Sequence, residues 1–291
     1  MPTTSTTGQL ENAQNTILAA ARYTEEHNAP ALALIEQFTL TKGNKKMVVP
    51  KVGQMTMADL QEGVDIVLEQ DIDMNTVELT ASEVGAKVIL TDKLVRQAND
   101  NVFAIIGRQL GDGMARKKDT DVIALWPNLN SGTVLSADNA AWTTAIVHNA
   151  IAYAKEKKFG SQLYIVHHPN AVAKLSQAAA TTADNNAELT SGWSLDLLKN
   201  FYSGLRPING VSIFEDGNIE KIGTTDSGYG VIADKGAMAA LNSMIPTTER
   251  QRDASLRATE LVMVADYGVF EIDDKRGAAF RAEIGTLIAT S

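Results

Sequence analysis

Hydrophobic and polar residues alternate along residues 76–90, a pattern that is typical of β-strands. Val77, Leu79 and Ala81 alternate with polar neighbours, and after Ser82–Glu83 the alternation resumes in the opposite phase. A period of two predicts strands with one buried face, and the change of phase predicts a bulge or tight turn. We therefore expect two consecutive strands, separated near residues 82–83.

The pattern then changes to a period of four, which predicts a helix that begins near Asp92. Its apolar face is formed by Leu94, Ala98, Val102, Ile106 and Leu110. A helix that continues to Leu125 holds about 32 residues and is about 48 Å long. Gly107, Gly111 and Gly113 each weaken a helix interior by about 0.5–1 kcal/mol. Two alternatives follow: two shorter helices broken near residues 111–113, or one long spine whose small residues let another segment cross closely.

Charged residues are segregated along residues 41–75, where turn residues separate short β-prone pieces. Four lysines come first, namely Lys42, Lys45, Lys46 and Lys51. An acidic run without an interleaved base follows, with Asp59, Glu62, Asp65, Glu69, Asp71 and Asp73. The pattern predicts a long projecting hairpin. This hairpin is either simply solvated or lies on an adjacent subunit and fixes register by charge complementarity. In the second case the candidate contacts between subunits are Lys42, Lys45, Lys46, Lys51, Asp59, Glu62, Asp65 and Glu69.

The remaining segments predict an N-terminal arm and a mixed α/β unit. In the arm, residues 9–27 favour an amphipathic helix and residues 32–40 a further helix or strand. After a loop at 126–132, helices are predicted at 143–158, 169–179, 195–201 and 235–241, strands at 162–166, 210–214 and 229–233, and a polar loop at 181–191. The chain closes with a long strand or bent pair at 259–272, a turn at 273–277 and a returning strand at 278–284. We expect this closing hairpin to pair with the strands at 76–90.

Composition excludes several classes of protein and site. Of the 291 residues 44% are hydrophobic, which is enough for the core of one large domain or two. A net charge of −9 argues against a protein whose main task is to bind DNA or an anionic membrane tightly. No apolar run has the length of a membrane span. The absence of cysteine excludes disulfides, thiolate metal sites and cysteine nucleophiles. The Thr-rich start lacks the features of a signal peptide, so we expect synthesis in the cytoplasm.

No pattern predicts catalysis or metal binding. His167 and His168 form the only histidine pair, and without an acidic partner at metal-ligand spacing they favour a strand-end or capping role. Residues 71–82 begin like a calcium loop, but Thr76 replaces the glycine at the sixth position and Ser82 the glutamate at the twelfth. The chain has neither a Gly-x-Ser-x-Gly elbow nor a His-Glu-x-x-His motif. We therefore predict no enzyme activity, no cofactor and no metal site.

Taken in order, these elements resemble the major capsid protein of tailed phages, the Hong Kong ninety-seven type fold. Residues 78–92 before the helix, Tyr164–Pro169, and Asp266–Val269 with the turn that follows look most like this family. The resemblance implies an α+β fold with an N-terminal arm, an extended E-loop hairpin, a P-domain with a long spine helix and a β-hairpin, and a mixed α/β A-domain. The order of elements along nearly the whole chain carries the resemblance.

The resemblance also implies a division of the chain into five segments. These are the N-terminal arm at 1–40, the E-loop at 41–75, the P-domain strands and spine helix at 76–135, the A-domain at 136–245, and the closing P-domain strands with the C-terminus at 246–291. Some relatives join subunits by a Lys to Asn isopeptide bond, for which the E-loop lysines are candidate amines. Because the sequence identifies neither the asparagine nor the assisting acid, we do not infer a crosslink from it.

The implied function is mechanical. Identical chains form hexamers and pentamers, which build an icosahedral shell around the double-stranded DNA of a phage virion. The implied partners are a separate scaffolding protein, a portal and a decoration protein, with weak non-specific contact to the DNA and none to a membrane. Two alternatives stay open from the sequence: an encapsulin-like nanocompartment shell of the same fold, and a soluble α/β enzyme or ligand-binding protein.

Overall fold

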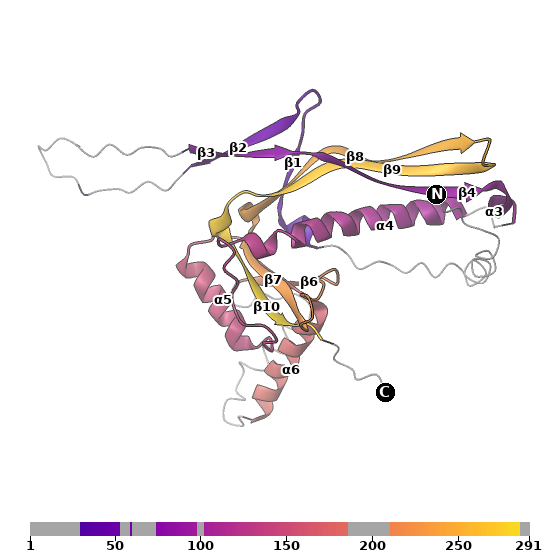
Figure 1. Ribbon diagram of the computed structural model, residues 1–291. Coiled ribbons are helices and arrows are strands. Elements are labelled where there is room, and N and C mark those ends of the chain that lie inside the picture. Colours follow the sequence, from indigo (N-terminus) through magenta and orange to yellow (C-terminus); the bar gives the residue numbers. More distant parts are fainter. Residues whose placement is uncertain (1–29, 53–58, 60–73, 98–101, 186–209, 286–291) are drawn as a thin grey trace, which may run out of the picture.

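The computed structural model describes residues 30–52, 59, 74–97, 102–185 and 210–285. These residues form two four-stranded sheets and one two-stranded ribbon. Figure 1 shows the first sheet running along a long helix, and the second sheet with two further helices beneath it. The ribbon projects on the side away from the free end of the first sheet. The predicted α+β class is confirmed.

The first sheet, here called the long sheet, joins strands that are far apart in the sequence. Its order is β1-β8-β9-β4. The strands are β1 (Glu36–Thr39), β4 (Ser82–Thr91), β8 (Met238–Asp253) and β9 (Ala258–Glu271). β1 runs parallel to β8, whereas β9 is antiparallel to both of its neighbours. The predicted pairing of the strand at 259–272 with the strands at 76–90 is therefore correct for β4.

A helix does begin at Asp92, as the sequence predicts, and the glycines do not break it. The two helices here are α3 (Asp92–Gln97) and α4 (Val102–Ile123), and residues 98–101 between them lie outside the described residues. α4 holds 22 residues and is continuous through Gly107, Gly111 and Gly113. The predicted break near 111–113 is wrong. The alternative of a close crossing is also not found, because a Cβ at any of these glycines would meet no described atom within 4 Å.

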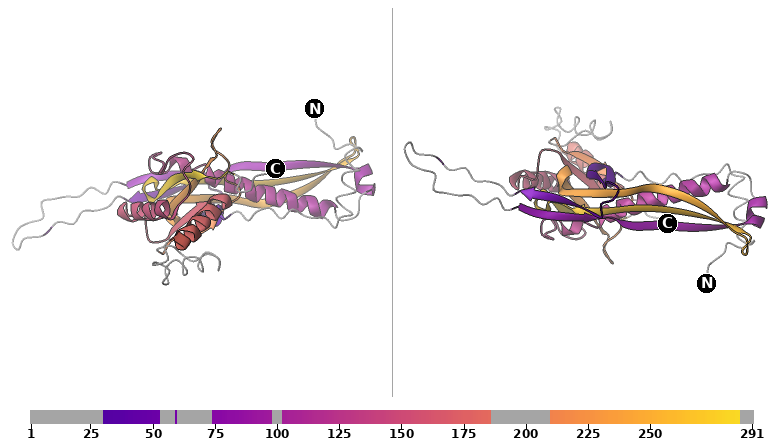
Figure 2. Two further views of the ribbon diagram at one scale, coloured as in Figure 1. Left: turned by 90° about the horizontal axis from the view of Figure 1, so that it is seen from below. Right: turned by 90° about the horizontal axis from the view of Figure 1, so that it is seen from above.

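α4 packs on the long sheet through alternate residues of β9. Met263, Ala265 and Tyr267 point toward the helix and form a buried cluster with Met114 of α4. Alternate strand residues share one face, so these three necessarily lie on the same side of the sheet. Figure 2 shows β4, β8, β9 and α4 running side by side away from the rest of the molecule. The spine and the strands thus support each other along their length.

The second sheet holds most of the hydrophobic core. Its order is β10-β7-β5-β6, with β5 and β6 parallel and the other pairs antiparallel. Its strands are β5 (Leu163–His167), β6 (Ser212–Glu215), β7 (Ser227–Asp234) and β10 (Gly277–Glu283), and its helices are α5 (Thr144–Glu156) and α6 (Pro169–Asn185). Thr143 caps α5 by accepting a hydrogen bond from the Ile146 amide at 3.4 Å. The mixed α/β unit predicted from the sequence is present.

The predicted helix at 235–241 is wrong. Its place is taken by a 3-10 turn, η2 (Lys235–Ala237), and by the start of β8. Met238–Leu241 is at most 1% exposed at every position. A strand buried on both faces has a continuous apolar run, which sequence periodicity does not separate from a buried helix. The predicted boundary between the A-domain at 136–245 and the closing strands at 246–291 therefore falls inside β8.

The returning strand belongs to a different sheet from the one predicted. Residues 278–284 were expected to pair with the strands at 76–90, but β10 pairs with β7 in the second sheet. After β9 the chain crosses between the sheets through η3 (Asp274–Arg276), and the earlier crossing from β7 to β8 runs through η2. The two crossings are joined because the amides of Ile272 and Asp273 both donate to the Ala237 carbonyl. A turn between two apolar strands does not reveal in the sequence that the second strand changes sheets.

Other predicted elements differ in extent. The break between the first two strands is at Ala81, and the loop at 126–132 contains η1 (Trp126–Asn128). α6 continues to Asn185, so the polar loop predicted from residue 181 begins too early. The segment at 32–40 contains both α2 (Ala31–Leu34) and β1. The predicted helices at 9–27 and 195–201 lie outside the described residues.

Candidate assembly interface

β2 (Lys46–Val52) and β3 (Met74–Thr80) form a two-stranded antiparallel sheet, here called the ribbon. The ribbon is the base of the hairpin predicted at 41–75, but its second strand continues to Thr80, so the strand predicted from residue 76 belongs to the hairpin. It projects from the body on the side opposite to the free end of the long sheet (Figures 1 and 2). Val48 is 45% exposed, and each ribbon strand pairs only with the other in the described part of the chain. An isolated two-stranded hairpin is marginally stable in water, and open strand edges can pair with another chain.

Three of the four candidate lysines are exposed near the ribbon. Lys42 and Lys45 lie in the turn between β1 and β2. Lys46 forms an ion pair with Glu78 of β3, and about half of each side chain is exposed, 50% and 56%. Such an exposed pair contributes little to stability, so Lys46 can exchange this partner for another at small cost.

The acidic candidates are only partly described. Asp59 is exposed, whereas Glu62, Asp65 and Glu69 lie outside the described residues. The structure therefore does not test whether the acidic run lies near the lysines. The role of all eight residues between subunits stays a prediction.

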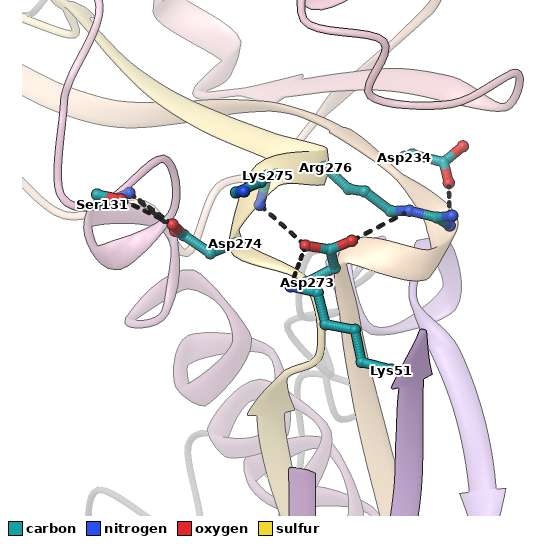
Figure 3. Close-up of polar contacts among 7 residues, drawn as sticks. All are labelled: Lys51, Ser131, Asp234, Asp273, Asp274, Lys275 and Arg276. Carbon is teal, nitrogen blue, oxygen red and sulfur yellow. Dashed lines mark hydrogen bonds and ion pairs between the residues drawn. The ribbon is translucent and has the colours of Figure 1, made fainter. Parts of the chain in front are cut away.

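Among the four candidate lysines, Lys51 differs because it forms an ion pair with a residue in the body of its own chain. Its Nζ lies 2.5 Å from Asp273 Oδ1 (Figure 3). Asp273 follows β9 at the crossing to β10 and caps η3 by accepting from the Lys275 amide. This contact ties the root of the ribbon to the crossing between the two sheets.

Arg276 extends this ion pair into the second sheet. Its Nε lies 3.5 Å from Asp273 Oδ2 and its Nη1 3.4 Å from Asp234 Oδ2. Asp234, at the end of β7, also accepts hydrogen bonds from the amides of Gln162 and Gly236. The guanidinium thus bridges the carboxylates of both crossings, β7 to β8 and β9 to β10 (Figure 3).

Asp274 connects the same turn to the end of the spine. Both of its carboxylate oxygens accept from the Ser131 amide, at 2.8 and 2.9 Å, and one also accepts from Ser131 Oγ. Asn130 and Ser131 have positive φ values of 58° and 54°, which are unfavourable for residues other than glycine. The Asp274 contacts offset this cost and hold the loop that follows α4.

We call Lys51, Ser131, Asp234, Asp273, Asp274 and Arg276 the junction. The sequence predicted a turn at 273–277 but missed the junction, since its contacts join residues as far apart as 222 positions. The only local signal was the run of four charged residues before Gly277. Through Lys51, the junction links the root of the ribbon to the crossings between the two sheets and to the loop after the spine.

The sequence profile of the phage capsid protein family matches residues 74–280, which is more than half of the chain. The chain belongs to the phage capsid protein family. It is a major capsid protein, a structural component of the virion.

Solved structures similar to this capsid protein share its fold at low sequence identity. The structure of Mycobacterium phage Che8 is 15% identical with a TM-score of 0.63, over 81% of this chain and 84% of that chain. The mature capsid of bacteriophage PhiM1 is 12% identical with a TM-score of 0.63, over 89% of each chain. The SrpI encapsulin of Synechococcus elongatus is 10% identical with a TM-score of 0.64, over 96% of this chain and 98% of that chain. Comparison with curated proteins gives no match.

The histidine pair of this capsid protein occupies structural positions. His167 is fully buried, with its ring 5.1 Å from those of Trp142 and Phe280. Burial, together with neighbouring His168, lowers the pKa of His167 to about 3, so its imidazole is neutral at physiological pH. His168 Nδ1 accepts from the Asn170 amide at the start of α6. These positions agree with the predicted strand-end and capping roles.

The described residues offer neither a metal site nor a membrane span. No group of three histidine, aspartate or glutamate side chains lies close enough to hold a metal ion in the described ranges. No helix among them is long and apolar enough to cross a membrane.

Proposed function

We propose that identical copies of this capsid protein form hexamers and pentamers that close into an icosahedral shell around packaged double-stranded DNA. The observation that carries the proposal is the ribbon, which projects from the body with open strand edges while the junction holds its root. A rigid root directs the ribbon to a fixed place on a neighbour. Repeated use of one such contact builds a large symmetric assembly from a single chain.

The proposed division of the chain follows the family pattern. The ribbon is the base of the E-loop at 41–75, α4 is the spine of the P-domain, and the second sheet with α5 and α6 is the core of the A-domain. The long sheet completes the P-domain. Because β8 lies wholly in the long sheet and β10 in the second sheet, residues 238–283 contribute to both domains.

Charge supports a shell that holds DNA weakly. The net charge of −9 disfavours extensive neutralisation of phosphates, which is the main source of tight non-specific binding. A lining that releases its DNA easily suits packaging and ejection. The further partners in this proposal are a scaffolding protein, a portal and a decoration protein, and synthesis takes place in the host cytoplasm.

A second candidate is a nanocompartment shell that encloses a cargo protein. The similarity to the SrpI encapsulin favours it at the level of fold alone. Genes for a terminase and a portal beside the gene for this chain support the phage shell, whereas a gene for a cargo enzyme supports the nanocompartment.

The experiment is electron microscopy with light scattering on the purified chain, alone and with a candidate scaffolding protein. The test variant is Lys42→Glu/Lys45→Glu/Lys46→Glu, which leaves Lys51 and the junction intact. Its control, Lys157→Glu/Lys158→Glu/Lys235→Glu, makes the same change in net charge at exposed lysines of the second sheet unit. We expect shells from the wild type and the control, and folded but unassembled subunits from the test variant. A stable monomer of the wild type under every condition contradicts shell formation, and normal shells from the test variant contradict the role of the lysines.

A further inference from the structure

Two carboxyl groups meet in the interior between the spine helix and the second sheet. Asp119 of α4 and Asp216, which directly follows β6, are both 0% exposed. Asn218 contacts both, because its side-chain amide donates to Asp119 Oδ2 at 3.0 Å and its backbone amide donates to Asp216 Oδ1 at 2.9 Å. The Leu32 amide donates to Asp119 Oδ1 at 3.3 Å. The pair therefore lies where α4, α2 and the segment after β6 come together.

The hydrogen bonds around the pair are incomplete unless one carboxyl carries a proton. Asp216 Oδ2 is buried and receives no hydrogen bond from the described residues. Two ionised carboxylates can only accept hydrogen bonds, so they cannot bond to each other. One proton makes Asp216 a donor to Asp119 and removes the repulsion between two buried charges. Burial, and next the neighbouring Asp119 carboxyl, raises the pKa of Asp216 well above its usual value of 3.8.

The pKa of Asp216 is set by burial, the Asp119 carboxyl and the Asn218 amide, and none of these is a cation. Lys118, next to Asp119, directs its Nζ away toward Asn242 at 3.1 Å and the Tyr267 ring at 4.8 Å. His167, whose carbonyl accepts from the Asp216 amide, is neutral. Along α4, Lys117 pairs with Asp121, whose other carboxylate oxygen accepts a hydrogen bond from the Tyr267 hydroxyl. Glu215 and Glu220, in the segment of Asp216, add negative charge, and α2 has no ionisable residue.

We propose that Asp119 and Asp216 share one proton and that this proton is a pH-sensitive latch between the spine helix and the second sheet. With the proton present, the two carboxyls hold α4 against the loop after β6. When it is lost, two buried negative charges repel each other and the contact loosens. The latch acts within one subunit, so it stands or fails separately from the formation of a shell.

The direction of the pH dependence follows from proton binding. Between the usual aspartate pKa and the raised pKa of Asp216, the folded chain binds more protons than the unfolded chain. Stability contributed by the pair is therefore fully present at acidic pH and is lost as the pH rises through the folded-state pKa. This direction is opposite to that of an ordinary ion-paired aspartate.

The test uses thermal unfolding of the full chain from about pH 5 to about pH 9. In Asp216→Asn an amide replaces the protonated acid and donates to Asp119 without titrating. We expect the Tm of the wild type to fall across this range by on the order of 3 °C more than that of the variant. The control Asp226→Asn, at an exposed aspartate paired with Lys221, should keep the slope of the wild type at alkaline pH. Parallel curves for the wild type and Asp216→Asn overturn the proposal.

An infrared measurement keeps the proposal testable if Asp216→Asn fails to fold. The wild type at neutral pH should show the C=O stretch of a protonated carboxylic acid, and this band should disappear in alkaline solution. Asp119→Asn, the reciprocal variant, should lack the band of the shared proton. The ion pair between Lys221 and Asp226 should stay as in the wild type. Absence of the band from the wild type at neutral pH overturns the proposal.

Discussion

Lys51 at the root of the ribbon forms a 2.5 Å ion pair with Asp273 at the crossing between the two sheets. The two side chains are 34% and 20% exposed, so water screens the pair only in part. The contact links the hairpin expected to reach a neighbour with the turn that sets the relative position of both sheets. Its main contribution is therefore to the direction of the ribbon.

Replacement of Lys51 by Met should loosen the ribbon with little loss of global stability. A partly exposed ion pair contributes about 1 kcal/mol or less, so the unfolding free energy should fall by no more than that. Amide hydrogen exchange in 46–52 and 74–80 should become faster because the root is no longer held. The matched control is Lys46→Met, which removes the more exposed pair with Glu78. Equal exchange rates in the two variants would contradict a special role for Lys51.

Replacement of Asp274 by Ala should destabilise the loop after the spine. The change removes the acceptors for the Ser131 amide and hydroxyl, so Ser131, which has a positive φ, loses the side-chain contacts that hold it. We expect a loss of about 1–2 kcal/mol in urea unfolding. Asp274→Asn keeps one acceptor oxygen and should lose less. A neutral effect of the alanine variant is incompatible with Asp274 as the anchor of this loop.

Local patterns predicted most of the elements, and contacts distant in sequence account for what was missed. The period of two at 76–90 and the period of four after Asp92 are properties of single elements, and both gave elements of the correct type. The assignment of β10 to the second sheet depends on β7, which precedes it by more than 40 residues. Met238–Leu241 was mistaken for a helix because burial on both faces removes the alternation by which a strand is recognised.

In the candidate interface, too, local patterns were predicted and contacts distant in sequence were missed. The segregation of charge at 41–75 predicted the hairpin, because turn residues and β-prone pieces are local signals. The junction was missed because Lys51, Asp234 and Asp273 come from three separate elements. In the sequence each is an ordinary charged residue near a turn. Their shared function as the root of the ribbon exists only in the folded chain.

Replacement of Arg252 by Lys should loosen the free end of the long sheet at neutral pH. Arg252 Nη1 and Nη2 donate to the two carboxylate oxygens of Asp92 at 2.8 and 2.7 Å, a two-point contact that lysine does not reproduce. The hydrogen bond from Arg252 holds the pKa of Asp92 below its usual value. Stability from this pair is present above the usual aspartate pKa and is lost as the pH falls through the lowered value.

Hydrogen exchange in α3 measures this effect. Arg252→Lys should exchange faster than the wild type at neutral pH, and the difference should shrink once Asp92 is protonated in acid. Arg257→Lys is the control, because the Arg257 side chain influences the Asp92 carboxylate only through its charge, and the Arg257 carbonyl that accepts from the Asp92 amide is unchanged in the variant. A difference that persists unchanged in acid would assign the effect to packing of the arginine rather than to the ion pair.

Replacement of Gly111 by Ala separates the needs of the single subunit from those of the shell. A Cβ at this position meets no described atom within 4 Å, and alanine is favoured over glycine in a helix interior by about 0.5–1 kcal/mol. The isolated subunit should therefore gain stability by about this amount in urea unfolding. If a neighbouring subunit crosses the spine closely at the glycines, the same variant should form fewer shells by electron microscopy.

The contrasting variant is Gly268→Ala, whose Cβ would lie 2.5 Å from the Thr80 carbonyl oxygen and should destabilise the subunit itself. A stabilised subunit with a normal yield of shells would show that the glycine face of α4 is open in the assembly too, whereas a destabilised Gly111→Ala subunit would contradict the packing described for the spine.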